Sequence, residues 1–332
     1  MCSPSLKVIW NITKKCGYDC DICATYSDRI ELESDGKNKV LSSILSLGEQ
    51  NIAGIDISGG DPLFATDSIQ IIHDAIRILG EKKISVTTTG KGINAALEFG
   101  EDLSRLLYNC EITIDCFDHY SDCLRNDSSY ITTNRDAIRT IEKNAVNLVI
   151  NVPVLNTKID DNNIKKMVDT IAKIDVCNIS VNLIRLMNVG RMHMHPYPSA
   201  YFPEHFVKTF IECAKNTCIK NVHVQCALRG KILGSQCNML SNKIGVDYSG
   251  NVFACPWGAY LADYDRNNIS ENPFYVGNLL YEPLSDLLTN KPAALLRQSI
   301  RDNPTKHCRV YCFANNSDSI FTDIDPLFSY GD

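Results

Sequence analysis

Short apolar runs rich in β-branched residues alternate along the chain with longer segments in which apolar residues recur at helical spacing. The apolar runs predict strands at 7–12, 54–58, 84–88, 111–115, 147–152 and 178–184. The longer segments predict helices at 39–50, 68–79, 93–107, 134–144, 162–174 and 204–216. Because strands and helices alternate, we expect an α/β fold with a parallel sheet, in the form of a partial (β/α)6 barrel.

Two segments rich in glycine, cysteine and polar residues follow the first two predicted strands. Cys16, Cys20 and Cys23 come after the first strand with the spacing Cys-x-x-x-Cys-x-x-Cys, and 58–62 reads Ser-Gly-Gly-Asp-Pro at the end of the second. In parallel α/β folds, ligand sites lie at the carboxyl ends of the strands. We therefore expect both segments at one rim of the barrel.

Three thiolates at this spacing can hold three corners of a 4Fe-4S cluster and leave one iron open. Most electron-carrying clusters have four thiolate ligands, so three ligands indicate a place where a small molecule binds the metal. A zinc knuckle or incidental thiols are the alternatives. Zinc sites favour two Cys-x-x-Cys pairs over this triplet.

The segments 15–23 and 58–62 together resemble the radical S-adenosylmethionine (radical SAM) superfamily. The resemblance implies that SAM chelates the open iron and that one electron from the cluster cleaves SAM to a 5′-deoxyadenosyl radical. It also implies SAM-binding roles for the segment at the end of the second strand, in which Asp61 replaces the family's glutamate. These residues are Ser58, Gly59, Gly60, Asp61 and Pro62.

Further SAM contacts follow from the same resemblance. Thr88 and Thr89 end the third strand, although a threonine run is also ordinary strand chemistry. Asp115 is expected at the ribose and Arg125 at the SAM carboxylate, unless Arg125 and Asp122 form only a surface ion pair. The last barrel strand and its extension are expected along the adenine, which places Asn182 and Leu186 there.

A second group of cysteines lies in the C-terminal third. The turn at Gly250 predicts a β-hairpin, with Cys237 before it and Cys255 after it, and Cys308 and Cys312 follow a predicted helix at 292–301. Two cysteine pairs suit a closed tetrahedral metal or cluster site. The pattern resembles the twitch module, a shortened SPASM domain, which implies that these four thiolates hold one auxiliary 4Fe-4S cluster. Structural zinc is the alternative.

The expected division is a barrel over 1–220, a twitch or SPASM-like module over 221–315 and a C-terminal tail over 316–332. Cys226 ends a predicted strand, 222–225, that leads from barrel to module. Three roles are open for Cys226: a fourth auxiliary ligand, a buried thiol of the kind that is common in proteins, or a catalytic hydrogen-atom donor.

The composition indicates the domain size, the cellular compartment and the classes of partner that are not expected. The chain has 332 residues, 44% of them hydrophobic and 22% charged, which suffices for one large domain with a smaller one appended. Its 15 cysteines, without a signal peptide's apolar core, indicate a reducing cytoplasm. A net charge of -6 offers no broad basic surface for nucleic acid, and no apolar run approaches the roughly 18 residues that span a membrane.

The resemblance implies an enzyme that takes hydrogen from an unactivated carbon of a ribosomally made peptide, causing epimerisation, oxidation or cross-linking. A dehydrogenase or epimerase of a sugar or aminocyclitol is the alternative. The first strand begins near Leu6, which leaves no room for an N-terminal peptide-recognition domain and lowers the expectation of a peptide substrate. A one-electron donor such as flavodoxin or ferredoxin is the expected partner. A zinc-stabilised binding scaffold is the non-enzyme alternative.

Overall fold

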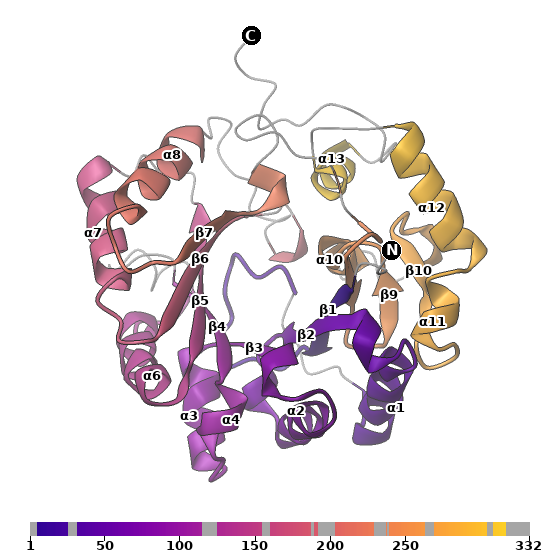
Figure 1. Ribbon diagram of the computed structural model, residues 1–332, viewed down its shortest axis with the longest axis horizontal. Helices are drawn as coiled ribbons and strands as arrows, with labels where there is room; N and C mark the ends of the chain where they lie inside the picture. The colour runs from indigo at the N-terminus through magenta and orange to yellow at the C-terminus, as the bar shows by residue number, and fades with distance from the viewer. Residues whose placement is uncertain are drawn as a thin grey trace.

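One curved sheet organises the protein, as a computed structural model shows. The structure describes residues 5–25, 32–114, 125–154, 160–186, 189–191, 203–228, 237, 239–262, 269–303 and 308–316. The sheet has 10 strands in the order β10-β9-β8-β1-β2-β3-β4-β5-β6-β7. Figure 1 shows this sheet curving in an arc, with most helices outside it.

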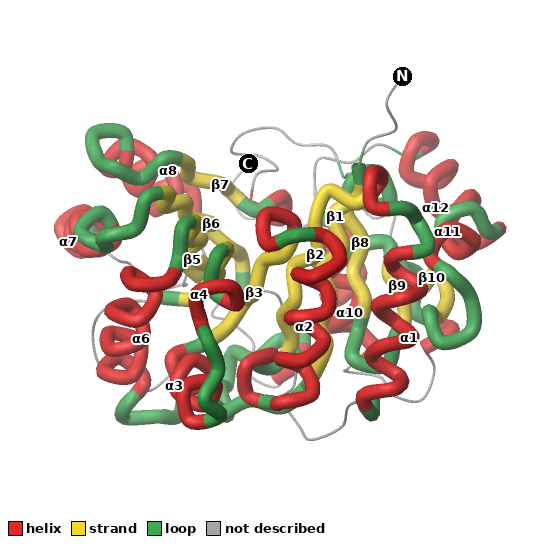
Figure 2. The backbone as a smooth tube through the Cα atoms, turned by 60° about the horizontal axis from the view of Figure 1, so that its bottom comes forward, coloured by secondary structure: helices red, strands yellow, loops and turns green. Residues whose placement is uncertain are grey.

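Parallel pairing runs through most of the sheet. β1 to β7 pair in sequence order, β8 pairs parallel with β1, and β9 and β10 add antiparallel strands beyond β8. The strands are β1 (Leu6–Thr13), β2 (Ile52–Gly59), β3 (Ile84–Thr88), β4 (Asn109–Thr113), β5 (Asn147–Val154), β6 (Asn178–Arg185), β7 (Asn221–Val224), β8 (Lys243–Val246), β9 (Asn251–Phe253) and β10 (Tyr275–Asn278). Figure 2 shows the strands side by side behind the helices.

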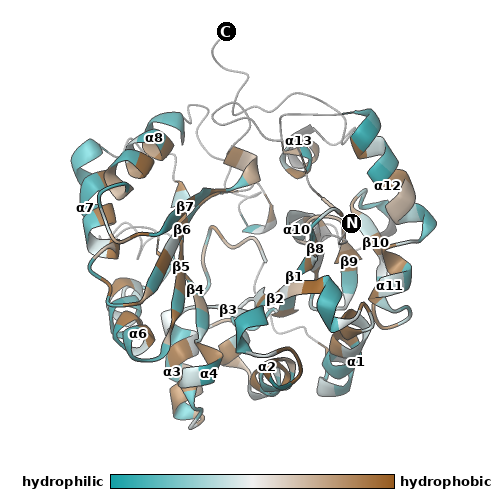
Figure 3. Ribbon diagram, in the orientation of Figure 1, coloured by the Kyte–Doolittle hydropathy of each residue, from teal (hydrophilic) through white to brown (hydrophobic). Residues whose placement is uncertain are grey.

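Helices lie on both sides of the sheet, most of them on its outer face (Figure 1). They are α1 (Ser34–Leu45), α2 (Thr66–Leu79), α3 (Gly90–Glu98), α4 (Leu103–Leu106), α6 (Tyr130–Asn144), α7 (Asp161–Ile171), α8 (Pro203–Ala214), α10 (Pro256–Ala262), α11 (Leu284–Leu287), α12 (Lys291–Asp302) and α13 (Arg309–Asn316), with 3-10 turns η1 (Glu49–Asn51), η2 (Pro62–Phe64), η3 (Glu81–Lys83) and η5 (Ile269–Glu271). Figure 3 shows polar residues on the outer turns of α7 and α12. Among the described helices, none has the length and apolar character needed to cross a membrane.

The predicted α/β barrel is confirmed, with four corrections. The helix expected over 93–107 is two helices, α3 and α4, because Gly100 adopts φ +80° between them and ends the first. β4 begins at Asn109 rather than at Glu111 and ends at Thr113, and β10 was not predicted. The strand expected over 222–225 is β7, which extends the barrel sheet beside β6.

The sheet runs across the expected boundary between barrel and module. β8 lies beyond residue 220 in sequence, yet it pairs with β1 from Lys7↔Lys243 to Trp10↔Val246. A hydrogen bond of 3.3 Å from the Tyr260 hydroxyl to Asn11 Oδ1 joins the same two parts. The C-terminal hairpin is therefore built onto the first barrel strand.

The barrel strands alternate between an apolar and a polar face. In β5, Leu148 and Ile150 are fully buried, whereas Asn147 and Asn151 on the opposite face bond to polar side chains of the neighbouring strand β4. Since alternate side chains of a strand point to opposite faces and helices cover the outer face, the polar set faces the concave side. This polarity gives the barrel an interior suited to polar groups.

Glu111 lies within this polar set. Asn182 Nδ2 donates to Asn151 Oδ1 at 3.1 Å, and Asn151 Nδ2 donates to Glu111 Oε1 at 2.6 Å. Burial and, after it, the nearby Asp56 carboxylate raise the pKa of Glu111 to about 7, against the effect of the Asn151 hydrogen bond. Glu111 is thus a carboxyl group that holds a proton near neutral pH.

Replacing Glu111 by glutamine tests this pKa. In the unfolded chain a glutamate ionises near pH 4.3, so between about pH 4 and pH 7 the folded protein retains a proton that the unfolded chain releases. The stability of the wild type therefore falls as pH rises through this window. We expect Glu111→Gln, which keeps the acceptor for Asn151, to be more stable than the wild type by roughly 1–3 kcal/mol at pH 8, and by less at pH 5.5.

Thermal unfolding at both pH values measures the difference, with the exposed Glu212→Gln as the control. A difference between Glu111→Gln and wild type that is the same at pH 5.5 and pH 8 would contradict the raised pKa.

Candidate active site

The three cysteines of the first motif lie in the loop that follows β1. Cys20 is buried, Cys16 and Cys23 are partly buried, and the Cys16 thiol is within electrostatic reach of the other two. Cys23 N donates to Cys20 O at 3.2 Å, which folds the loop back on itself. Tyr18 and Tyr130 pack edge to face beside them, with ring centroids 5.1 Å apart, so the thiols face a largely apolar wall.

The Gly-Gly-Asp segment at the end of β2 lies directly against this loop. Gly60 N donates to Thr13 O and Asp61 N donates to Lys15 O, both at 2.7 Å. A Cβ on Gly59 would lie 2.2 Å from Thr13 O, and one on Gly60 would lie 2.2 Å from Lys15 O. Glycine is therefore required at both positions because the two backbones are in contact.

The Asp61 carboxylate is surrounded by donors from the protein. Oδ1 accepts from Leu63 N at 3.1 Å and from Thr88 Oγ1 at 2.8 Å. Oδ2 accepts from Thr89 N at 2.9 Å and from Thr89 Oγ1 at 2.6 Å. Burial raises the pKa of Asp61 to about 6, against the effect of these bonds. Asp61 thus joins the ends of β2 and β3.

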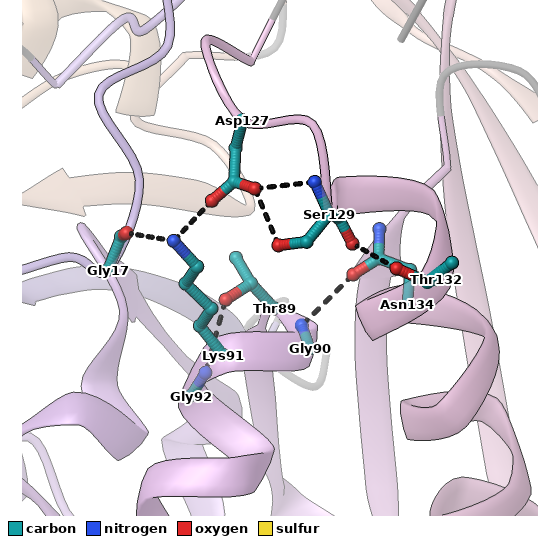
Figure 4. A network of polar contacts seen from close by, with 9 residues as sticks. All are labelled: Gly17, Thr89, Gly90, Lys91, Gly92, Asp127, Ser129, Thr132 and Asn134. Atoms are coloured by element: carbon teal, nitrogen blue, oxygen red, sulfur yellow. Dashed lines mark hydrogen bonds and ion pairs between the residues drawn. The ribbon is translucent and has the colours of Figure 1, made fainter. Parts of the chain in front are cut away.

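Lys91 ties the cysteine loop to α3, as Figure 4 shows. Its Nζ donates to Gly17 O at 2.9 Å, forms an ion pair with Asp127 and lies 4.5 Å from the centroid of the Tyr18 ring. Sequence reasoning did not single out Lys91. The available signal was a lysine directly after the Thr-Gly that ends a barrel strand.

Two arginines reach the cysteine loop from later parts of the chain. Arg125 Nη1 donates to Cys20 Sγ at 3.7 Å, and its guanidinium lies over the Tyr130 ring. Arg191 Nη1 donates to Cys20 O at 3.1 Å, its backbone N donates to Cys23 O at 3.0 Å, and it pairs with Asp19. Arg191 was not among the predicted residues.

The other predicted SAM-binding residues divide into three groups. Ser58 and Pro62 stand at the rim with the glycines, and the Ser58 hydroxyl donates to Asn11 Oδ1 at 2.9 Å. Leu186 packs against the apolar cluster around Tyr18, whereas the Asn182 amide bonds to a neighbouring strand, as described above. Asp115 and Asp122 lie outside the described residues.

The second cysteine group contains Cys226 together with Cys237, Cys255 and Cys308. Each of the last three thiols interacts electrostatically with Cys226, and Cys255 also interacts with Cys237 and Cys308. Burial raises the thiol pKa of all three. Cys312 lies in α13, but its side chain is outside the described residues. Cys226 therefore lies near three of the four predicted auxiliary ligands, although it was not itself in the predicted ligand set.

Comparisons with known proteins give the family. Residues 7–132 match the family model of a 4Fe-4S single cluster domain, and residues 237–313 match the model of the SPASM iron-sulfur cluster-binding domain. The chain is a radical SAM enzyme with a SPASM domain. No curated protein sequence matches it.

Solved structures agree with this fold. Streptococcus suis SuiB bound to precursor peptide SuiA has a TM-score of 0.65 and 15% sequence identity, over 90% of this chain and 67% of SuiB. SuiB bound to S-adenosylmethionine gives 0.62 and 14%, over 89% and 68%. The anSMEcpe protein with AdoMet and the Cp18Cys peptide gives 0.61 and 16%, over 98% and 94%.

The cysteines of this radical SAM enzyme suit iron-sulfur clusters. Its cofactors are SAM, a SAM-binding 4Fe-4S cluster and an auxiliary 4Fe-4S cluster. A single zinc ion needs all its thiolates within about 2.3 Å, and no three described His, Cys, Asp or Glu side chains converge on a single metal ion. A four-iron cluster instead takes each thiolate at a different iron, and iron binding deprotonates a buried thiol.

Replacing Asp61 by asparagine tests the link between β2 and β3. The amide NH2 group of asparagine would face a donor from which the carboxylate now accepts a hydrogen bond. One buried hydrogen-bonding group would then be left unsatisfied. We expect a loss of about 1–3 kcal/mol in the free energy of unfolding, measured by anaerobic urea denaturation. The control is Asp102→Asn, which keeps a surface cap of α4 that asparagine provides equally well. Equal effects of the two substitutions would refute the role of Asp61.

Iron counts test the position of Cys226. In a background with Cys16, Cys20 and Cys23 all replaced by alanine, the auxiliary site alone should retain about four irons. We expect Cys226→Ala to lower this count, while the exposed Cys177→Ala leaves it unchanged. Full iron in Cys226→Ala combined with loss in Cys312→Ala would instead restore the originally predicted ligand set.

Proposed function

We propose that this radical SAM enzyme oxidises or cross-links a ribosomally made peptide by removing hydrogen from an unactivated carbon. The peptide substrate is supported by fold similarity to SuiB with its precursor peptide, over 90% of this chain, and to anSMEcpe with a peptide, over 98%. The oxidative outcome is supported by the second cysteine group, since a thiol engaged there is not a hydrogen donor to the substrate.

In this proposal, Cys16, Cys20 and Cys23 hold the SAM-binding cluster, and Cys226, Cys237, Cys255 and Cys308 hold the auxiliary cluster. When bound, the first cluster supplies the electron that cleaves SAM to a hydrogen-abstracting 5′-deoxyadenosyl radical, and the second supplies an acceptor for the electron that the substrate then loses. The substrate thus gives up one hydrogen atom, one electron and one proton. An external one-electron donor, such as flavodoxin or ferredoxin, starts each turnover.

The chain's own residues position these groups. The Gly59–Gly60 backbone, held by Asp61, presents the rim against which SAM binds. Thr88 and Thr89 orient the Asp61 carboxylate, because both of their hydroxyls donate to it. Lys91, Arg125 and Arg191 hold the cysteine loop in place, and the apolar wall beside the thiols excludes water.

Reductive cleavage of SAM is the first test. After anaerobic reconstitution we expect roughly eight irons per chain, and 5′-deoxyadenosine on reduction with SAM. The triple alanine variant of Cys16, Cys20 and Cys23 should lose cleavage and keep the auxiliary iron. Cleavage retained by that variant would overturn the assignment of the SAM-binding cysteines.

Mass spectrometry of candidate substrates then tests whether the substrate is a peptide and whether it is oxidised. A peptide that loses two hydrogens, about 2 Da, would support oxidation or an intramolecular cross-link. An unchanged mass with an inverted stereocentre would replace oxidation by epimerisation. If peptides neither bind nor change while a sugar or aminocyclitol is oxidised, the substrate class is wrong but the radical chemistry stands.

A further inference from the structure

Two buried arginines border the second cysteine group. Arg185, the last residue of β6, is 1% exposed, and Arg309, the first residue of α13, is 2% exposed. They come from the barrel and from the C-terminal module respectively. A guanidinium remains charged at all physiological pH values, so each brings a full positive charge into the interior.

Arg185 joins the segments that carry two of the thiols. Its backbone N donates to Gln225 Oε1 at 2.7 Å, and Nη1 donates to Ala227 O at 3.3 Å, on either side of Cys226. Its guanidinium lies 3.2 Å from the centroid of the Tyr311 ring in α13, the helix that follows Cys308. The Arg185 guanidinium also lies within electrostatic reach of the Cys308 thiol.

Arg309 lies on the other side of the group. It follows Cys308 directly in sequence, donates from Nη2 to Asn303 O, and makes a side-chain hydrogen bond with Cys237. The Arg309 guanidinium thus lies beside the Cys237 thiol. The two arginines therefore act on two different thiols of the set.

Burying a cation is costly unless negative charge lies beside it. A cluster held by four thiolates supplies negative charge, and its charge becomes more negative on reduction. Positive charge and hydrogen bonds to the sulfurs therefore stabilise the reduced form more than the oxidised form, and these are the factors by which a protein sets a cluster's potential.

We propose that Arg185 and Arg309 are positioning residues of the auxiliary cluster that raise its reduction potential, so that it can accept the electron lost by the substrate. This inference rests on the proposed auxiliary ligand set. Arg185 also links the two sites: the next residue, Leu186, packs against the apolar cluster beside Cys16 and Cys23.

A redox titration of the auxiliary cluster tests the proposal. It is carried out in the triple alanine background of Cys16, Cys20 and Cys23, so that only the auxiliary cluster contributes, and the reduced cluster is followed by electron paramagnetic resonance. We expect Arg185→Gln and Arg309→Gln each to shift the midpoint potential to more negative values. The matched control is the exposed Arg139→Gln, which should leave the potential unchanged.

Iron content separates the two ways the experiment can fail. If the parent triple variant holds no iron, the proposed ligand set fails before the arginines are tested, and the inference falls with it. If a glutamine variant binds less iron than the parent, the lysine variant at the same position is titrated instead, since it keeps the positive charge but loses the planar group. We expect the lysine variant to shift the midpoint potential in the negative direction by less than glutamine would. Fully loaded variants with unchanged potentials would overturn the proposal.

Discussion

Contact between two backbones organises the candidate active site. Thr13–Lys15, where the cysteine loop begins, lies against Gly59–Asp61, at the end of the neighbouring strand, with hydrogen bonds of 2.7 Å. A side chain at either glycine would collide with a carbonyl oxygen. Because both segments are the carboxyl ends of parallel strands, the fold brings them together, and the absence of side chains lets them touch.

Charged side chains also hold the cysteine loop in position. The described part of the cysteine loop, 14–25, contains no helix or strand, so its conformation depends on groups from other elements. Lys91 and Arg191 bind its carbonyl oxygens, and Arg125 reaches the Cys20 sulfur. These side chains come from the start of α3 and from segments after β4 and β6. The loop is thus held by the rim of the barrel as a whole.

The second cysteine group depends on the same sheet in a different way. Cys226 follows β7 at one end of the strand order and Cys255 follows β9 near the other. The sheet curves (Figure 1), and the thiols of Cys226 and Cys255 lie within electrostatic reach of each other although their strands are far apart in its order. Arg185 joins these two parts of the chain, because its guanidinium donates to Ala227 O, next to Cys226, and stacks on the Tyr311 ring. The module is in this respect a continuation of the barrel.

The sequence by itself determined most strands and helices of the barrel, the three-cysteine loop and the Gly-Gly-Asp-Pro turn, because each depends on neighbours within a few residues. Only the tertiary structure decided that Thr88 and Thr89 donate to Asp61, that Lys91 and Arg191 bind the cysteine loop, and that Cys226 joins the second thiol group. Those contacts join residues tens to more than a hundred positions apart. Their geometry is set by how strands pair and how the sheet curves, and local patterns carry no record of either.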